Sequence, residues 1–166
     1  ILQNEMEELR ASEEHMDRMN RSLHRTLGRH TFVCCCIVIV DLNRRRASVV
    51  NGGCPYPYLY SAQTGEIGEV STGGLPLGAM PHSKYATTEL ELKKGDVMVF
   101  CSDGIVEANK GDEIFGFDRT SDCVQSASSA NGNAEQIAKQ IFAEVDSFVQ
   151  NEDQNDDQTV VVLKIK

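Results

Sequence analysis

Three features are missing from this sequence: an apolar run long enough to cross a membrane, a CxxC cysteine pair and an excess of basic residues. The 166 residues include 16 Lys and Arg against 25 Asp and Glu, a formal net charge of −9. Nucleic-acid binders need a basic stripe to meet phosphates, so this class is excluded. With neither a membrane-length run nor a leader-like start, we expect no membrane segment and a cytoplasmic location.

Cysteine is present without the spacing of a metal or disulfide framework. Three of the six cysteines are consecutive within an apolar stretch, where neighbouring side chains of a strand face opposite ways. This pattern is typical of small buried hydrophobic residues in a reducing compartment, and the lack of a CxxC pair disfavours a zinc site. The six are Cys34, Cys35, Cys36, Cys54, Cys101 and Cys123.

The chain is long enough for one domain with a sizeable core, and it begins with a helical pattern. Apolar residues recur at steps of three, four and seven through residues 1–27 and predict one amphipathic helix. The simplest interpretation is a helix packed on a sheet. Because residues 1–16 are highly charged, a linker-like or coiled-coil-like start is the alternative.

Strand patterns follow the helix. The β-branched run at 31–42 predicts a central strand covered on both faces, with 47–53 as its partner. Residues 56–70 predict a hairpin that turns at Thr64-Gly65. Two further strands are expected at 85–92 and 96–102, joined by a tight turn in "KKGD".

The C-terminal third combines helix, loops and a closing strand. Residues 134–150 predict a second amphipathic helix, because Ile137, Ile141, Val145 and Phe148 share one face. We expect polar loops at 121–133 and 151–157, and a strand at 158–166. No internal repeat is present. The predicted fold class is therefore α+β, with helices flanking a mainly antiparallel sheet.

Acidic residues occur where two apolar strands meet loops. Asp103 follows "VMVFCS", and Asp156-Asp157 precede "QTVVVLKI". If these strands are neighbours, the acids emerge at one edge of the sheet, within reach of one ion. Mg²⁺ and Mn²⁺ prefer oxygen ligands and are often held by one or two carboxylates. Gly104 would let the backbone turn sharply beside the ion. Taken singly, Asp-Gly is also a common turn and "DD" a common solvated loop.

Four stretches in order carry a family pattern: "NGGCPYPYLY", "GGLPLGAMP", "LKKGDVMVFCSDGIVEANKGDEIFG" and "NDDQTVVVLKIK". Together they resemble the SpoIIE/RsbU-like branch of the metal-dependent serine/threonine protein phosphatases, the type 2C or PPM superfamily. That pattern includes a strand ending in Thr/Ser-Asp-Gly, an acidic-x-Phe-Gly step and a final Asp-Asp-x-Thr. The resemblance covers nearly the whole chain from about residue 17, and it implies a partial α-β-β-α sandwich.

The resemblance also implies the chemistry. In that family two Mn²⁺ or Mg²⁺ ions activate a water that attacks the phosphorus of phosphoserine or phosphothreonine, with no covalent enzyme intermediate. Carried over by motif, Asp103 and Asp156 would be metal ligands, and Asp157 an alternate ligand or an orienting group. We assign no catalytic residue beyond the metal-bound water. Glu107 is expected to cap or pair locally.

The asparagine-glycine segment is expected to be structural. Asn51, Gly52 and Gly53 would permit a close turn between strands. Where the family often has histidine, this chain has Cys54, which weakens any role of the loop in proton donation. The four histidines lie outside the matching motifs, so we expect solvated or capping roles for them.

One part of the family pattern is missing. The first metal motif, with the aspartate that bridges the two ions, has no counterpart, because both Gly-Asp pairs, at 95–96 and 111–112, belong to later motifs. Two explanations compete: residues 1–166 are one phosphatase domain that is incomplete at its N-terminus, or the chain is a natural variant that has lost catalysis. We favour the first, and expect the isolated segment to be weak or inactive.

The expected partners follow from analogy. A bacterial member would act on a phosphorylated regulatory protein, similar to an anti-sigma-factor antagonist, under an upstream sensor domain. Sheet edges left uncovered by an incomplete sandwich favour a homodimer or a swapped assembly. Two rival functions stay open: a catalytically inactive phosphatase-like binding or signalling module, and a generic acidic α+β domain in which Asp103 and Asp156 lie far apart.

Overall fold

The computed structural model describes residues 13–28, 30–150 and 152–166, and these form two compact units. We describe each unit by itself. The first unit comprises Ile1–Cys54 and Ser71–Leu92, and the second comprises Pro55–Val70 and Lys93–Lys166.

The first unit is built on a three-stranded antiparallel sheet in the order β1-β2-β5. β1 (Cys35–Asp41) pairs along its whole length with β2 (Arg46–Gly52), and β5 (Thr88–Glu91) pairs with the other edge of β2. The predicted pairing of 31–42 with 47–53 is thus confirmed. Cross-strand polar pairs reinforce β2 and β5: Arg46 with Glu91 at 3.1 Å, and Ser48 with Glu89 at 2.6 Å.

The prediction of a central, fully covered strand at 31–42 is wrong for the described residues. β1 is an edge strand, and all seven of its residues are only half-buried. β2 takes the central position, with Ala47, Val49 and Val50 fully buried. An unbroken β-branched run indicates that a strand forms, but it does not indicate which strand occupies the middle of the sheet.

The helix predicted at the start of the chain is confirmed where the structure describes it. α2 (Glu13–Thr26) places Met16, Met19 and Leu23 against a cluster formed with Val50 and Leu77. Residues 1–12 of that predicted helix, including most of the linker-like stretch 1–16, lie outside the described residues.

The second unit contains a four-stranded antiparallel sheet in the order β4-β3-β6-β9. The predicted hairpin at 56–70 is confirmed as β3 and β4, and the closing strand as β9. Gly65 adopts a φ of +73° in the hairpin loop. The strand bounds are β3 (Tyr58–Tyr60), β4 (Ile67–Glu69), β6 (Val97–Cys101) and β9 (Val160–Lys164).

The turn predicted in "KKGD" is present, but the strands that it joins belong to different sheets. Gly95 has a φ of +91°, and the buried Asp96 carboxylate accepts the amides of Lys93 and Ala62 at 2.7 and 3.0 Å. The turn is therefore fixed by its own hydrogen bonds. β5 pairs with β2 and β6 pairs with β3 and β9, so turn chemistry alone did not reveal the partners.

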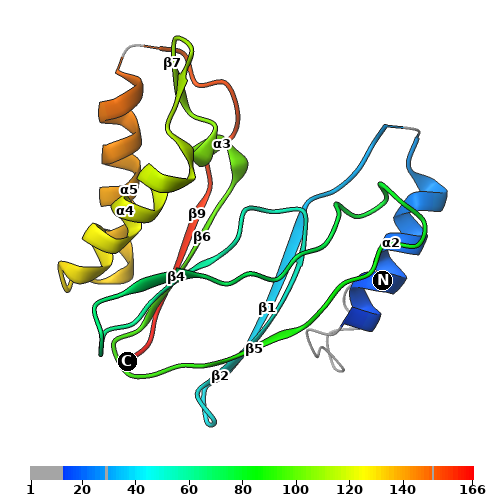
Figure 1. The fold of residues 1–166 in the computed structure, drawn as a ribbon, viewed down its shortest axis with the longest axis horizontal. Helices are drawn as coiled ribbons and strands as arrows, with labels where there is room; N and C mark the ends of the chain where they lie inside the picture. Colours follow the sequence, from blue (N-terminus) through cyan, green and yellow to red (C-terminus); the bar gives the residue numbers. More distant parts are fainter. Residues whose placement is uncertain (1–12, 29, 151) are drawn as a thin grey trace. The chain divides into compact units, whose positions relative to one another are not determined.

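Two helices cover the sheet of the second unit (Figure 1). α5 (Ala134–Val149) confirms the predicted helix and begins with a capping box in which Asn133 and Gln136 exchange side-chain to backbone hydrogen bonds. α4 (Gly116–Ser129) corrects the prediction of a polar loop at 121–133. Its buried stripe contains one branched aliphatic residue among small or hydroxyl residues, so the helical period was hidden: Thr120, Cys123, Val124, Ala127 and Ser128.

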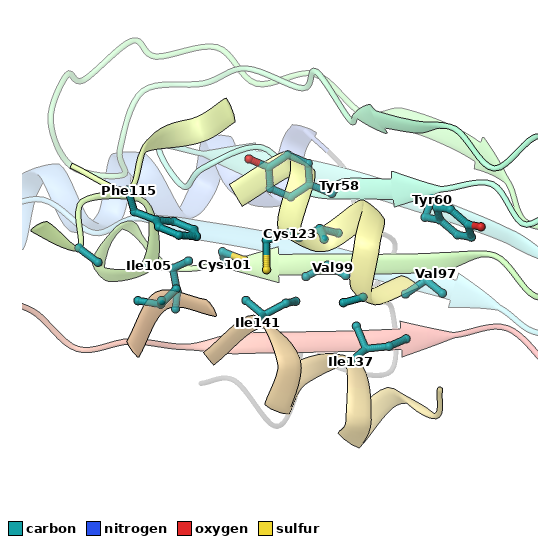
Figure 2. Packing of buried hydrophobic residues seen from close by; sticks show 14 residues of the cluster. Tyr58, Tyr60, Val97, Val99, Cys101, Ile105, Phe115, Cys123, Ile137 and Ile141 are labelled. Carbon is teal, nitrogen blue, oxygen red and sulfur yellow. The ribbon is translucent and has the colours of Figure 1, made fainter. Parts of the chain in front are cut away.

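The core of the second unit lies between this sheet and the two helices (Figure 2). Ile137 and Ile141 of α5 and Cys123 of α4 lie beside Val97, Val99 and Cys101 of β6. Beyond β6 come the short helix α3 (Asp103–Val106) and a small hairpin of β7 (Asn109–Lys110) and β8 (Glu113–Ile114). The expected fold class, helices with antiparallel sheets, is confirmed. None of the helices in the described residues is long and apolar enough to span a bilayer.

Candidate metal centre

The two acidic segments lie at the same end of one pair of strands. β6 and β9 are antiparallel neighbours in which Cys101 faces Val160, and the Ser102 amide donates to the Thr159 carbonyl at 2.9 Å. Asp103 follows β6 directly after this pair, and the Asp156-Asp157 segment precedes β9. The condition set by the sequence, that the two strands be neighbours, is met.

Gly104 shows how closely the two segments approach. A Cβ atom added at Gly104 would lie 2.4 Å from the carbonyl oxygen of Asp157 and 3.2 Å from that of Asp156. The 2.4 Å distance is shorter than any Cβ atom tolerates and 3.2 Å is a tight contact, so without a shift of the loop only glycine admits this approach. Asp103 is the first residue of α3 rather than part of an isolated Asp-Gly turn. The reading in which Asp103 and Asp156 lie far apart does not agree with this geometry.

Local hydrogen bonds shape the acidic loop before β9. The Asp156 carboxylate accepts the amide of Asp157 at 2.7 Å, and its carbonyl accepts the Gln154 side chain at 2.7 Å. The Asn155 side chain bonds to Asn109 at the base of the β7–β8 hairpin. Asp103, Asp156 and Asp157 are exposed, so an approaching ion would reach their carboxylates without crossing the core.

A pocket of about 480 Å³ opens beside these residues, within the second unit. Its lining includes Gly104 and Asp156, and none of the described lining residues is Lys or Arg. This concentration of one charge sign favours cations. Glu107 was expected to cap or pair locally, and it caps α3: its backbone amide donates to the Asp103 carbonyl at 2.7 Å. Four further carboxylates line the pocket: Glu107, Asp146, Glu152 and Asp153.

The described residues do not make a complete two-metal centre. Among them, no group of three or more His, Cys, Asp or Glu side chains is arranged to hold an ion. Asp103 and Asp156, with Asp157 beside them, supply hard oxygen donors of the type that Mn²⁺ and Mg²⁺ prefer. They supply too few of them for two divalent ions, and no catalytic step follows from these residues alone.

The asparagine-glycine segment belongs to the first unit and has a steric explanation. The buried Asn51 amide bonds to both the N–H and the C=O of Cys54, at 3.0 and 2.9 Å. Gly53 has a φ of +90°, and a Cβ there would lie 2.5 Å from Pro76. At Gly52 the same atom would meet Met16 at 3.0 Å. All three positions are fixed by packing and turn geometry.

Sequence reasoning missed two features, one beside the acids in the second unit and one in the first unit. The Ser102 hydroxyl bonds to the acidic loop, and the only signal for it was the hydroxyl residue that precedes Asp-Gly in the family pattern. The expectation of solvated or capping histidines was wrong for His15, which is buried, with Nδ1 3.0 Å from the Arg18 guanidinium. His24 lies with Nδ1 2.8 Å from the Gly78 carbonyl. A histidine on an amphipathic helix gives no sign of such contacts.

Comparison with curated proteins found no match. Several solved structures share the fold. The SiaA PP2C domain of Pseudomonas aeruginosa has a TM-score of 0.78 at 19% identity, covering 95% of this chain and 61% of that one. The RsbU and RsbW domains of a Mycobacterium tuberculosis protein score 0.74 at 21%, covering 97% and 44%. The SpoIIE phosphatase domain of Bacillus subtilis scores 0.60 at 21%, covering 80% and 56%.

This chain therefore spans about half of the length of the solved structures that it matches. At such identities the structural matches establish the fold, and the sequence match establishes the family. Residues 1–166, the whole chain, match the family described as Stage II sporulation protein E (SpoIIE). The chain belongs to the SpoIIE family of PP2C-like phosphatase domains.

Proposed function

We propose that this chain is part of a metal-dependent protein phosphatase domain that hydrolyses phosphoserine or phosphothreonine on a regulatory protein. In this proposal Asp103 and Asp156 are ligands of a divalent cation, and Asp157 is an alternate ligand or orients the other two. The observation that carries the proposal is the backbone contact between Gly104 and Asp157, which brings the acidic ends of β6 and β9 together.

The metal assignment has support from related proteins. The SpoIIE phosphatase domain of Bacillus subtilis was solved after presoaking with Mn, and RsbX was solved in complex with magnesium. The exposed carboxylates of this chain are hard donors for either ion. We therefore propose Mn²⁺ or Mg²⁺ as the cofactor, with two ions in the complete site.

We propose that the remaining ligands come from outside the described residues. No described group of three acidic, histidine or cysteine side chains can hold an ion, and the chain covers 44–61% of the three solved structures. We propose that residues 1–166 are an N-terminally incomplete domain, and that the bridging aspartate lies in the part without a counterpart here. Consequently the isolated segment is weakly active or inactive.

The partner is proposed from the same family. We propose that the substrate is a phosphorylated regulatory protein, of the anti-sigma-factor-antagonist kind, with a sensor domain upstream and the cytoplasm as the location. The membership in the SpoIIE family supports this proposal. The incomplete ligand set favours a second candidate, an inactive phosphatase-like signalling module that binds its partner without hydrolysis.

The test compares this chain with a protein in which the upstream segment of its parent is restored. We expect Mn²⁺-dependent hydrolysis of a phosphoserine peptide by the longer protein, and at least about a hundredfold less by residues 1–166, because losing only an outer-shell partner of a metal ligand already costs about 10–100-fold. Asp103→Asn and Asp156→Asn should each abolish the activity of the longer protein. Asp112→Asn, in the exposed β7–β8 hairpin, is the matched control and should leave it unchanged. A longer protein that neither hydrolyses the peptide nor is stabilised by Mn²⁺ would favour the signalling module.

A further inference from the structure

Ser102 makes four hydrogen bonds, three of which connect it to the segment before β9. Its amide donates to the Thr159 carbonyl at 2.9 Å, and its carbonyl accepts the amide of Ile105 at 3.1 Å. Its hydroxyl accepts the amide of Thr159 at 2.9 Å and donates to the carbonyl of Asp157 at 3.0 Å. The Ser102 backbone thus bonds to the start of β9 and to α3, while its side chain bonds to the start of β9 and to the acidic loop.

This arrangement solves a problem of chain geometry. In a regular antiparallel ladder, the facing residues Ser102 and Thr159 would exchange two backbone hydrogen bonds. The Ser102 carbonyl has left the ladder to start α3, whose first residue is Asp103. The hydroxyl takes the place of that carbonyl as acceptor for Thr159. The side chain does not cap α3, although Ser102 occupies the N-cap position.

We propose that Ser102 is a positioning residue that holds the Asp156-Asp157 loop in register with Asp103. This inference rests on the proposed function, because it explains how two carboxylates on separate segments are kept ready for one cation. Alanine at this position would leave the Thr159 amide and the Asp157 carbonyl without their partner. Threonine would keep the hydroxyl. Gly104 then acts with Ser102, since its missing side chain admits the Asp157 carbonyl that the hydroxyl binds.

The experiment uses residues 1–166 labelled with ¹⁵N, without metal, in four forms: wild type, Ser102→Ala, Ser102→Thr and Thr120→Val. Thr120 is the matched control, because its buried hydroxyl bonds to the Gly116 carbonyl at 2.7 Å, in α4 and away from the acidic loop. Amide exchange of Thr159 should be about tenfold faster in Ser102→Ala, as expected for one lost hydrogen bond. It should match wild type in Ser102→Thr and Thr120→Val. Unchanged exchange in Ser102→Ala, or equal acceleration in Thr120→Val, would overturn the inference.

A second arm tests the link to the cation with MnCl₂ alone. Paramagnetic broadening of the Gly104 and Asp157 amides reports binding beside both segments. We expect the apparent affinity for Mn²⁺ to fall about tenfold in Ser102→Ala and to be kept in Ser102→Thr, as for other residues that orient ligands. If wild type shows no broadening, the proposed metal function fails while the first arm still decides the positioning role. Equal broadening in wild type and Ser102→Ala would overturn the claim that Ser102 prepares the site.

Discussion

Gly104 is the residue where one added methyl group would most directly separate the acidic ends of β6 and β9. Gly104→Ala would place a carbon 2.4 Å from the Asp157 carbonyl, so the loop before β9 must move. We expect a loss of about 1–3 kcal/mol in the free energy of unfolding, measured by urea denaturation, as for other overpacked sites. Gly68→Ala in β4 is the control, because nothing lies within 4 Å of its added Cβ and its effect should stay within about 0.5 kcal/mol. Equal stabilities of the two variants would contradict the close approach.

Two cysteines in the core of the second unit give a prediction for pH. Burial raises the pKa of Cys101 to about 12 and that of Cys123 to about 11, from an ordinary value of 9.0. Because the thiolate is the reactive form, alkylation of these two by iodoacetamide at pH 8 should be at least a hundredfold slower than in the chain unfolded by guanidinium. Comparable labelling rates, located by mass spectrometry, would contradict their burial.

The raised pKa values of Cys101 and Cys123 also determine how the stability of the fold changes with pH. The folded pKa values lie above those of the unfolded thiols, so the unfolded chain ionises first as the pH rises. This contribution to stability is fully present below about pH 9 and is lost as the pH approaches 11 to 12. Thermal melting between pH 8 and pH 11 should show a falling midpoint, which Cys101→Ala would make less steep.

At the level of single residues, the sequence was informative where a side chain sits at a recognisable boundary. Asp103 and Asp156 could be predicted to lie at strand ends because each borders an apolar strand, whereas the pairing of β6 with β9 became visible only in the structure. The contacts of Ser102 could not be predicted, since its hydroxyl bonds across to a loop more than fifty residues away, and no local pattern reports such a contact. The buried Asp96 carboxylate is similar: its two amide partners become visible only when the turns around it are formed.

Among the elements, β1 stands out as an edge strand without the usual protection. Within the described residues only β2 pairs with it, and its first six residues carry no charge, proline or bulge. Natural edge strands commonly use such features to block pairing with other chains. We expect residues 1–166 to form a homodimer through antiparallel pairing of two β1 strands.

Light scattering over a range of concentrations measures this directly, with a mass twice that of the monomer as the expected result. Val38→Lys should return the protein to the monomer by placing a charge on the edge. Val161→Lys in β9 is the control, because that strand already carries Lys164 and Val161 is 55% exposed. A monomer at the highest concentration, or a dimer lost equally in both variants, would contradict pairing through β1.

Element boundaries were predictable where capping or turn residues mark them. Asn133 and Gln136 begin α5, and Gly65 turns the β3–β4 hairpin. α4 was missed because its buried stripe consists mostly of small and hydroxyl residues, which are equally typical of loops. The position of β1 at the edge of its sheet was missed because tertiary pairing, rather than composition, decides which strand is central.

For the whole molecule, the ordered set of motifs was more informative than composition. Net charge and length excluded classes of protein, whereas the four linked stretches pointed to the SpoIIE family that the sequence match then established. The full ligand set could not be recovered in the same way. Metal ligands converge from distant parts of a chain, and among the described residues no group of three or more His, Cys, Asp or Glu side chains is placed to hold an ion.

We propose that the carboxylates of Asp103 and Asp156 share one divalent cation. Anomalous diffraction from a crystal of residues 1–166 soaked in MnCl₂ would locate that ion. We expect a manganese peak at the ends of β6 and β9, within about 2.5 Å of oxygen atoms from both residues, and its loss in Asp103→Asn. A crystal in which manganese binds elsewhere, or in which the two carboxylates point to separate sites, would contradict it.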